Sequence, residues 1–232
     1  MACVLAMYGD EPETPGANLG LIRGWGAEVR WTGDPDRASV DPAMEKAVAE
    51  LEAAGRRPYL VPRGGATAIG ALGYLDAAGE LAGQLEAAGV EPELIVVAAG
   101  SCGTLAGLHA GRAAHGLPGR LVGASVSRPL DECEERVLRI ATEAAELAGT
   151  AGPRASDVSV VDARGPAYAE PSEESDAAAR LAADTEGLLL DHVFTAKAMA
   201  AFLSMAGDGP SVFVHTGGIV AAIERAGGGG HG

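Results

Sequence analysis

The sequence predicts an α/β fold in which crossover helices connect the strands of a parallel sheet. Predicted strands and helices alternate along almost the whole chain, which is typical of βαβ units. The runs Ile95–Ala98 and Val212–Val214 are continuously apolar, as expected for parallel strands that are buried on both faces. Ligands bind beyond the carboxyl ends of the strands in such sheets, so the turns that follow these strands are the first places to look for a site.

The first part of the chain is predicted to contain three short strands and two helices. Short apolar runs predict the strands, and longer amphipathic stretches predict the helices. Asp41-Pro42 marks a helix start, because proline fits the first turn of a helix. In chain order the predicted elements are strand Cys3–Tyr8, helix Asn18–Gly26, strand Ala27–Trp31, helix Asp41–Ala54 and strand Tyr59–Pro62.

The rest of the chain continues the alternation. The turn Arg63–Thr67 precedes a long alanine-rich helix, and Pro129 opens a second long helix. The glycine-rich tail 227–232 is expected to be flexible. The predicted elements are helix Ala68–Ala88, strand Leu94–Ala98, helix Thr104–His115, strand Arg120–Ser127, helix Pro129–Ala148, strand Val158–Val161, helix Glu173–Thr185, helix Thr195–Ala206, strand Ser211–Val214 and helix Ile219–Ala226.

Composition and charge exclude several classes of protein. The 232 residues can bury the core of one domain, or of one domain and part of a second. A net charge of −15 argues against binding to nucleic-acid phosphates. No apolar run is long enough to cross a membrane, and the opening Met1–Tyr8 lacks the basic residues of a signal peptide. We therefore expect a cytoplasmic protein that binds neither nucleic acid nor a membrane.

The cysteines and histidines predict neither a disulfide framework nor a metal site. Cys3, Cys102 and Cys133 are odd in number and scattered along the chain, which fits a reducing compartment. His109 and His115 are six residues apart and so lie on different faces of the predicted helix. We expect no bound metal ion.

Gly100-Ser101-Cys102-Gly103-Thr104 is the strongest candidate for a binding loop, because it joins a buried strand to a helix start. Consecutive N–H groups at a helix N-terminus, helped by the hydroxyls of Ser101 and Thr104, can hold a phosphate without a basic residue. The alternative is a tight turn with a serine cap. The glycine spacing of a Rossmann dinucleotide site is not met.

Two further glycine turns are ambiguous in the same way. Gly64-Gly65-Ala66-Thr67 and His215-Thr216-Gly217-Gly218 can each be a capped helix start or part of a ligand cleft. Because Gly100–Thr104 and Thr216–Gly218 both follow strand ends, they can converge on one cleft.

The chain has two lysines, and of these Lys197, one turn into a predicted helix, could be a nucleophile, although a structural role is the favoured interpretation for both. Lys46 lies near Glu45 and Glu50 on an amphipathic helix, which indicates a solvated face. Lys197 is expected to form an ion pair or to face the exterior of its helix.

Cys133 is likewise a poor candidate for a nucleophile. The acidic residues around it indicate an acidic surface and would raise the pKa of its thiol. They are Asp131, Glu132, Glu134 and Glu135.

Five stretches together resemble the D-cysteine desulfhydrase and aminocyclopropanecarboxylate deaminase family of pyridoxal-phosphate (PLP) enzymes. They occur in family order and cover nearly all of the chain: residues 57–74, 96–108, 123–128, 185–199 and 215–218. The resemblance implies PLP fold type II, the fold of the tryptophan synthase β subunit, incomplete at its N-terminus. It also implies PLP as the cofactor.

The resemblance assigns roles to individual residues. Thr216 would lie near the pyridine nitrogen of the cofactor, with Thr195 close by, and a hydroxyl there favours a neutral ring. Lys197 matches a lysine that the family carries in addition to the one that holds PLP as a Schiff base. The phosphate would be bound by Ser101, Cys102, Gly103 and Thr104, and the active site would be lined by Gly64, Gly65, Thr67, Phe194 and Gly217.

The sequence departs from the family pattern in three ways. Cys3-Val4-Leu5 aligns with a strand inside the family's small domain, so the segment with the Schiff-base lysine and the serine stretch for the substrate carboxylate is not represented. Phe194 stands where the family usually has a tyrosine, and a phenyl ring cannot transfer a proton. Ala66-Thr67 replaces the usual Ser-Asn.

These departures leave three hypotheses open. The first is a split PLP enzyme for elimination, deamination or replacement on a small amino acid. In it a second polypeptide supplies the lysine, so that no residue of this chain is catalytic and the assembly is an oligomer. The second is a non-catalytic binding or regulatory module that pairs with a full-length relative. The third is a degraded fragment that is unstable alone. The expected domains are a remainder of the small domain over 1–56 and a large PLP-binding domain over 57–226.

Overall fold

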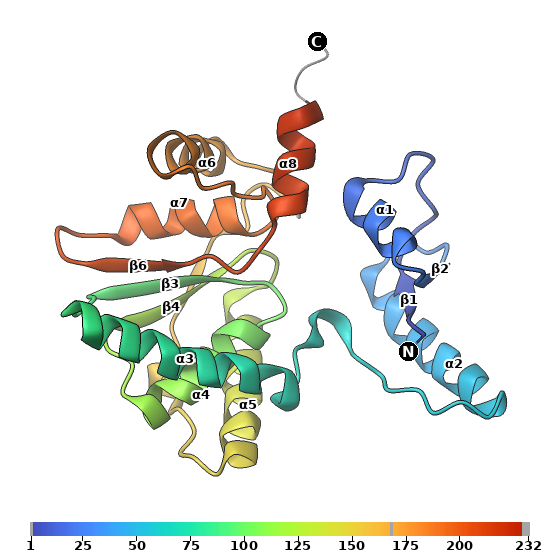
Figure 1. The fold of residues 1–232 in the computed structure, drawn as a ribbon, viewed down its shortest axis with the longest axis horizontal. Helices are drawn as coiled ribbons and strands as arrows, with labels where there is room; N and C mark the ends of the chain where they lie inside the picture. Colours follow the sequence, from blue (N-terminus) through green and yellow to red (C-terminus); the bar gives the residue numbers. More distant parts are fainter. Residues whose placement is uncertain (1, 168, 229–232) are drawn as a thin grey trace. The chain divides into compact units, whose positions relative to one another are not determined.

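The computed structural model describes residues 2–167 and 169–228. Contacts between residues divide the chain into two units, which are described separately. The large unit is Gly64–Ala222, and the small unit is Met1–Arg63 together with Ile223–Gly232 (Figure 1). One boundary therefore falls at Arg63, in the turn before the long alanine-rich helix, and the other falls within the last helix.

The large unit is built on a four-stranded parallel sheet. Its strands are β3 (Leu94–Ala99), β4 (Arg120–Ser125), β5 (Val160–Asp162) and β6 (Ser211–Val214), in the spatial order β5-β4-β3-β6. Every neighbouring pair is parallel. The α/β class with a parallel sheet is therefore confirmed.

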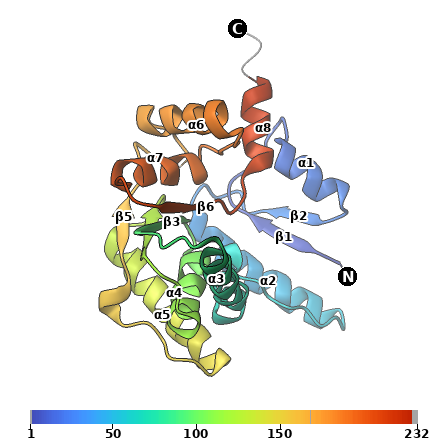
Figure 2. The same cartoon turned by 60° about the vertical axis from the view of Figure 1, so that its left-hand side comes forward.

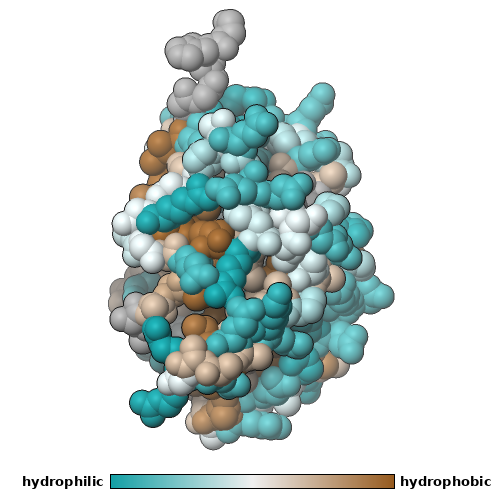
Figure 3. Space-filling model, turned by 90° about the vertical axis from the view of Figure 1, so that its right-hand side faces the viewer, coloured by the Kyte–Doolittle hydropathy of each residue, from teal (hydrophilic) through white to brown (hydrophobic). Residues whose placement is uncertain are grey.

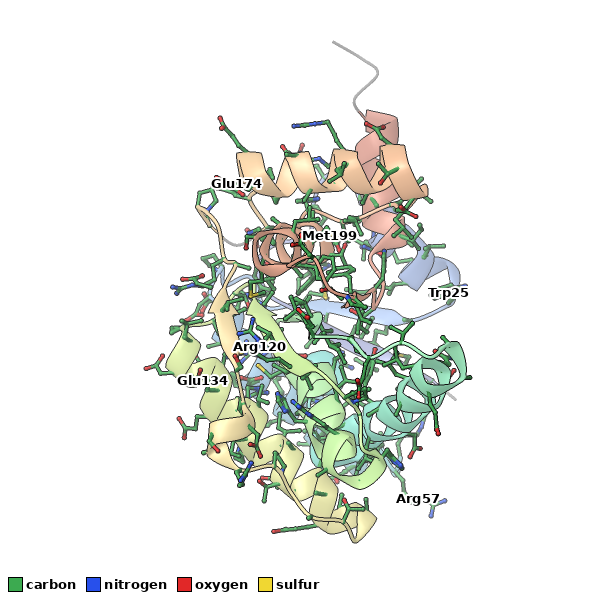
Figure 4. The ribbon with its side chains drawn as sticks, turned by 90° about the vertical axis from the view of Figure 1, so that its left-hand side faces the viewer. Trp25, Arg57, Arg120, Glu134, Glu174 and Met199 are labelled. Carbon is green, nitrogen blue, oxygen red and sulfur yellow. The ribbon has the colours of Figure 1, made fainter. Side chains whose placement is uncertain are left out.

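Helices cover both faces of this sheet, as Figures 1 and 2 show. One layer holds α3 (Ala68–Ala88), α4 (Gly103–His115) and α5 (Leu130–Ala148), and the opposite layer holds α6 (Glu173–Glu186) and α7 (Thr195–Met205). A core forms on each side of the sheet. Ile95 and Leu121 face α4 and α5, whereas Val96 and Val122 pack toward Ala198 of α7. Met199 lies between α7 and α6 in Figure 4 and belongs to a third apolar cluster.

Two glycines let α3 and α4 approach closely. A Cβ added to Gly107 would collide with the Ala71 carbonyl and lie 2.5 Å from Tyr74 Cβ, and one on Gly111 would lie 2.6 Å from Ala78 Cβ. The backbones therefore touch where these glycines face α3. This contact fixes where α4 begins and so helps to place the turn that precedes it.

The small unit is built on a two-stranded parallel sheet of β1 (Val4–Met7) and β2 (Glu28–Trp31). Its helices are α1 (Ala17–Gly24), α2 (Val40–Ala53) and the end of α8 (Ile219–Gly228). Glu224 of α8 accepts a hydrogen bond from the Ala17 amide at 3.0 Å and so caps α1. Every residue of both strands keeps part of its surface accessible.

Three short 3-10 turns complete the described elements: η1 (Arg37–Ser39), η2 (Arg63–Gly65) and η3 (Ala155–Asp157). Two large apolar residues of the small unit remain exposed: Trp25, just after α1, is 79% accessible, and Tyr59, before η2, is 77% accessible. Figure 3 shows hydrophobic residues reaching the surface among hydrophilic ones on the face that it presents.

Two predictions about elements need correction. Tyr59–Pro62 is not a strand, because its residues find no neighbouring strand in the described sheets and stay largely exposed. Helix α8 continues to Gly228, so two residues of the predicted flexible tail are helical, and the rest of that tail lies outside the described residues. None of the helices in the described part of the chain is long and apolar enough to cross a membrane.

Candidate cofactor-phosphate site

The order of the strands predicts a ligand crevice between β3 and β6. The chain steps from β3 to β4 to β5 in one direction and then returns to the other side of β3 as β6. Such a reversal is the switch point at which doubly wound sheets bind ligands, beyond the carboxyl ends of the strands. Val97 pairs with Val214, so Gly100 and Gly217 each follow this pair by three residues. The two turns therefore follow neighbouring strands at the same edge of the sheet, and the cleft between them stays a prediction.

The turn Gly100–Cys102 delivers the first amides of α4 to this crevice. Cys102 has a φ of +76°, which is uncommon for a residue with a side chain. A left-handed residue next to right-handed ones turns successive N–H groups toward one point, forming an anion-binding concavity. The amides of Ser101, Cys102, Gly103 and Thr104 donate no hydrogen bond within the described part of the chain, so four donors are available there.

The alternative of a serine cap does not apply to α4. The residue at the cap position is Cys102, and no side chain caps this helix. The hydroxyls of Ser101 and Thr104 are half-buried, and neither has a hydrogen-bond partner among residues 2–167 and 169–228. In α3, by contrast, Thr67 accepts a bond from the Gly70 amide at 3.1 Å and is an ordinary helix cap.

The turn Gly64–Thr67 packs directly against the Gly100–Thr104 loop. A Cβ on Gly64 would lie 2.5 Å from Ser101 Cβ, and one on Gly103 would lie 3.2 Å from Ala66 Cα. Gly64 also has a φ of +71°, so a side chain there is disfavoured by space and by conformation. Gly65, with a φ of +59°, continues this turn. Gly64 and Gly65 therefore lie beside the candidate loop, and their role in lining an active site stays a prediction.

Phe194 closes one side of the loop. A Cβ on Gly100 would lie 2.8 Å from Cε1 of Phe194, so the ring rests on the glycine while 38% of the residue stays exposed. The ring therefore lies beside the candidate loop, and it brings no acid or base to it.

Thr195 is buried rather than open to a ligand. Its hydroxyl donates to Asp191 Oδ1 at 2.7 Å and accepts from the Asp191 amide at 2.8 Å. The carboxylate of Asp191 also accepts from the amides of Val193, Phe194 and Thr195. Both hydrogen bonds of the Thr195 hydroxyl therefore stabilise the start of α7. Thr195 is buried, whereas its neighbour Phe194 is the residue that contacts the loop.

Thr216 and Gly217 remain open at the end of β6. Both are exposed, and the Thr216 hydroxyl has no hydrogen-bond partner among the described residues. The Gly217 amide donates to His215 Nδ1 at 3.3 Å. Thr216 is thus free to donate to a ligand, and the loop around it is held by His215.

Cys102 contributes its backbone to the site and its side chain to the core. Its Sγ lies 3.4 Å from Sγ of Cys133, and both residues are buried. The hydrogen bond between the thiols lowers the pKa of Cys102. The same bond, together with burial, raises the pKa of Cys133. The predicted rise is met, but its cause is the thiol pair. The acidic residues around Cys133 point to solvent, as Glu134 does in Figure 4.

The two lysines have opposite environments. Lys46 is 79% exposed and lies 4.0 Å from Glu50, so the prediction of a solvated face is confirmed. Lys197 is buried, and its Nζ donates to the carbonyls of Arg164 at 2.5 Å and Ala167 at 2.9 Å. The prediction of an ion pair or an exterior position was wrong, because backbone carbonyls satisfy the ammonium inside the fold. Burial lowers the pKa of Lys197.

Three residues that support the site were not found from the sequence. Asp191 precedes Thr195 by four residues, a spacing that could have indicated a capped helix start. Arg128 donates to the Gly100 carbonyl and Arg136 donates to the Ser101 carbonyl, both at 3.0 Å. Their acceptors are backbone atoms far away in the sequence, which no spacing rule reveals.

These donors fit the phosphate group of a small ligand. The loop offers free amides and two hydroxyls, its side chains are uncharged, and two arginines stand behind it. This is the donor set that binds a phosphate monoester at a helix N-terminus. No cluster of three or more His, Cys, Asp or Glu side chains suited to a metal ion occurs in residues 2–167 and 169–228.

Known proteins are similar to this chain in sequence. The chain is 44% identical to the D-cysteine desulfhydrase of Yersinia enterocolitica over 176 residues, covering 72% of this chain and 52% of that protein. It is 40% identical to the D-cysteine desulfhydrase of Klebsiella pneumoniae over 184 residues, covering 75% of this chain and 55% of that protein. The chain therefore spans about half the length of the curated relatives it matches.

Solved structures agree with the sequence matches. A crystal structure described as an ACC deaminase homologue superposes with a TM-score of 0.85 at 34% identity, over 95% of this chain and 67% of the other. O-ureido-L-serine synthase shares the fold, with a TM-score of 0.58 at 17% identity, over 91% of this chain and 63% of the other. The resemblance to the desulfhydrase and deaminase family and the type II fold are thereby confirmed. Residues 1–217 match the family described as "Pyridoxal-phosphate dependent enzyme", and the chain belongs to that family.

Proposed function

We propose that this chain forms the phosphate-binding part of a PLP-dependent enzyme that acts on a small amino acid by elimination, deamination or replacement. The observation that carries the proposal is the loop Gly100–Thr104 at the switch point of the sheet, where four amides and two hydroxyls have no hydrogen-bond partner among the described residues. When bound, PLP supplies an electron sink for charge that develops at the substrate α-carbon.

The residues of this chain would hold and orient the cofactor. The amides of Ser101–Thr104 and the hydroxyls of Ser101 and Thr104 would bind its phosphate. The Thr216 hydroxyl, which is free in the crevice, would donate to the pyridine nitrogen and leave the ring neutral. The Gly64–Gly65 turn and the ring of Phe194 would exclude water from either side of the loop. None of these groups is placed to hold a proton at the α-carbon.

The lysine that holds PLP as a Schiff base would come from a segment outside these 232 residues. Lys197 is a poor candidate because its amino group already donates to two carbonyls. Lys46 lies on the exposed face of α2 in the small unit, beside Glu50. The curated relatives contain a further segment of nearly half their length that this chain does not match. We propose that such a segment, expected on a second polypeptide, carries the lysine.

The small unit offers the place where this segment would dock. A two-stranded sheet is marginal by itself, and each outer edge presents unpaired N–H and C=O groups. Residues of β1 and β2 are all partly accessible. The lysine-bearing segment of the relatives is the occupant that we propose, because it would extend this sheet and cover its faces.

A reconstitution experiment tests this function. The chain is co-expressed with the unmatched segment of the Yersinia enterocolitica D-cysteine desulfhydrase, and the mixture is assayed for complex formation, bound PLP, and breakdown of D-cysteine and small amino acids. We expect a defined complex that binds PLP and releases product. The same segment without its Schiff-base lysine should form the complex and fail to react. A complex that binds no PLP would contradict the proposal.

Thr104→Val sharpens the same experiment because it removes one hydroxyl and keeps the shape of the side chain. A lost hydrogen bond to a charged group weakens binding about tenfold or more, so PLP should bind at least about tenfold more weakly. Thr185→Val is the matched control, because the Thr185 hydroxyl bonds to the Leu181 carbonyl within α6. Equal PLP affinity in both variants would mean that the loop is only a helix start.

Phe194 favours a second candidate function, a non-catalytic module that binds a phosphorylated ligand or pairs with a full-length relative. The phenyl ring leaves this side of the site without a proton carrier. If the reconstituted complex binds PLP and turns over no amino acid, even with Phe194→Tyr, the binding module replaces the enzyme as the better account.

A further inference from the structure

Two arginines lie behind the phosphate loop and hold consecutive carbonyl groups. Arg128, just after β4, donates from Nε to the Gly100 carbonyl at 3.0 Å. Arg136, two turns into α5, donates from Nε to the Ser101 carbonyl at 3.0 Å. The turn between β3 and α4 is thus tied to α5 at two successive peptide groups.

Peptide geometry links these carbonyls to the amides that face the crevice. The Ser101 carbonyl belongs to the same planar, trans peptide group as the Cys102 N–H, so the two point in opposite directions. The Gly100 carbonyl is paired with the Ser101 N–H in the same way. An arginine that holds the carbonyl on one side therefore fixes the direction of the N–H on the other side. A cationic donor on the carbonyl also polarises the peptide and strengthens its N–H as a donor.

Arg136 differs from Arg128 in its charge balance. Arg128 forms an ion pair with Glu132, whereas Arg136 forms none within the described part of the chain. Both lie close to the loop. The hydrogen bond with Cys133 lowers the pKa of Cys102 most; burial opposes it, the charges of Arg128 and Arg136 lower the pKa further, and the charge of Glu132 raises it. The side chains of Gly100–Thr104 are uncharged, so Arg136 supplies positive charge at this turn without forming an ion pair among the described residues.

We propose that Arg136 is a positioning residue for the cofactor phosphate. It aims the Cys102 N–H toward the phosphate by holding the Ser101 carbonyl, and its positive charge favours the phosphate dianion. This inference rests on the proposed function, since it concerns the same phosphate site. Arg128 fixes the neighbouring Ser101 N–H and contributes less charge.

A purely structural role for Arg136 makes a different prediction. If Arg136 only stabilised the packing of α5 against the turn, its loss would weaken the binding of every ligand equally, or of none. If it orients an amide toward the phosphate, its loss should weaken ligands that carry a phosphate and spare those that do not. PLP and pyridoxal, which differ only in this group, separate the two cases.

The experiment compares Arg136→Gln, Arg136→Lys and Arg139→Gln in the full chain. Arg139 is the matched control because it lies on the same helix, is about half exposed and pairs with Glu143 at 3.0 Å. Affinities for PLP, pyridoxal and inorganic phosphate are measured by calorimetry. Amide resonances of Ser101, Cys102 and Thr104 are followed by NMR as inorganic phosphate is added. Thermal unfolding of each variant confirms that it folds.

We expect Arg136→Gln to lower the affinity for PLP about tenfold, which is the effect of one lost charge-assisted hydrogen bond. The affinity for pyridoxal should not change. Arg136→Lys keeps the charge without the rigid guanidinium, so its affinity for PLP should lie between those of the wild type and Arg136→Gln. Arg139→Gln should match wild type. In Arg136→Gln the Cys102 amide should lose its shift with phosphate, while the Thr104 amide keeps its own.

The outcomes separate this inference from the function on which it rests. Wild-type protein that binds PLP no better than pyridoxal would overturn the phosphate site and this inference together. If the wild-type protein prefers PLP to pyridoxal, and both Arg136→Gln and Arg136→Lys bind PLP with the same affinity as the wild type, only this inference is overturned. A drop for pyridoxal as large as that for PLP would also overturn it. If Arg136→Gln does not fold, the Cys102 resonance in Arg136→Lys decides between the two roles.

Discussion

The large and small units differ in how far each completes its own sheet. The large unit surrounds four parallel strands with helices on both faces, and Ile95, Val96 and Val97 of β3 are fully buried. The small unit contains two strands in the described part of the chain, and each of their residues stays partly accessible. The candidate phosphate site lies entirely in the large unit.

This difference indicates which unit forms a packed core with its own strands and helices. Binding a phosphate needs a rigid turn between a buried strand and a helix, and the large unit provides both. The small unit's sheet has two partly accessible strands in the described part of the chain, and a two-stranded sheet is marginal by itself. The contrast predicts large effects for changes inside the large unit and small effects in the small unit.

The largest effect is expected where α3 and α4 touch. Gly107→Ala would place a methyl group against the Ala71 carbonyl and 2.5 Å from Tyr74 Cβ, which should destabilise the protein by about 3 kcal/mol. Gly73→Ala is the matched control, because its Cβ would have no neighbour within 4 Å and should stabilise α3 by about 0.5–1 kcal/mol. Urea unfolding measures both, and equal stabilities would refute the close helix contact.

The second effect depends on pH and arises from His109. Both ring nitrogens of this buried residue lack a hydrogen-bond partner, and burial lowers its pKa from 6.5 to about 4. The folded state resists protonation while the unfolded state accepts it, so stability present above pH 6.5 is lost as pH falls toward 4. The loss from this group is about 3 kcal/mol.

Substitutions isolate the contribution of His109. His109→Phe should remove this part of the pH dependence, whereas His115→Gln, at an exposed position of the same helix, should leave it unchanged. Stability is measured by urea unfolding between pH 7 and pH 4. The same pH slope in His109→Phe and wild type would contradict the burial of a neutral ring.

The third effect compares the two lysines, one in each unit. Lys197→Met removes bonds to two carbonyls from segments 30 or more residues away, and should cost about 1–2 kcal/mol. Lys46→Met removes a long, exposed contact with Glu50 and should change stability by less than about 0.5 kcal/mol. Calorimetry of both variants checks this order, and a larger loss for Lys46→Met would reverse the comparison of the units.

The smallest effect is expected at Trp25 in the small unit. Its side chain is 79% exposed, so Trp25→Ser should change the stability of the isolated chain by no more than about 0.5 kcal/mol. Because it reduces exposed apolar surface, it should improve solubility. A strong loss of stability would show that Trp25 is packed in solution.

The sequence predicted the elements best where local signals and tertiary packing agree. Helix α3 has the predicted bounds Ala68–Ala88, since Thr67 caps it and Gly89 ends it in a left-handed conformation. Tyr59–Pro62 failed as a strand because an apolar run needs a neighbouring strand, and pairing is not visible from composition.

The candidate site could be predicted in its backbone but only partly in its side chains. Glycine spacing located the Gly100–Thr104 loop, because its conformation is local. Whether a side chain is free depends on partners that are distant or unexpected. Thr195 is occupied by Asp191, Lys197 is occupied by carbonyls some 30 residues away, and Arg136 acts through a carbonyl 35 residues away.

The central claim is that this chain holds the cofactor phosphate without supplying the lysine that bonds to the cofactor. Its most direct test is to incubate the purified chain with PLP, with and without excess inorganic phosphate, and then to reduce it with borohydride and map the peptides by mass spectrometry. We predict binding that inorganic phosphate competes away, with no stoichiometric label on Lys46 or Lys197. Complete labelling of a single peptide that contains Lys197 would contradict the claim.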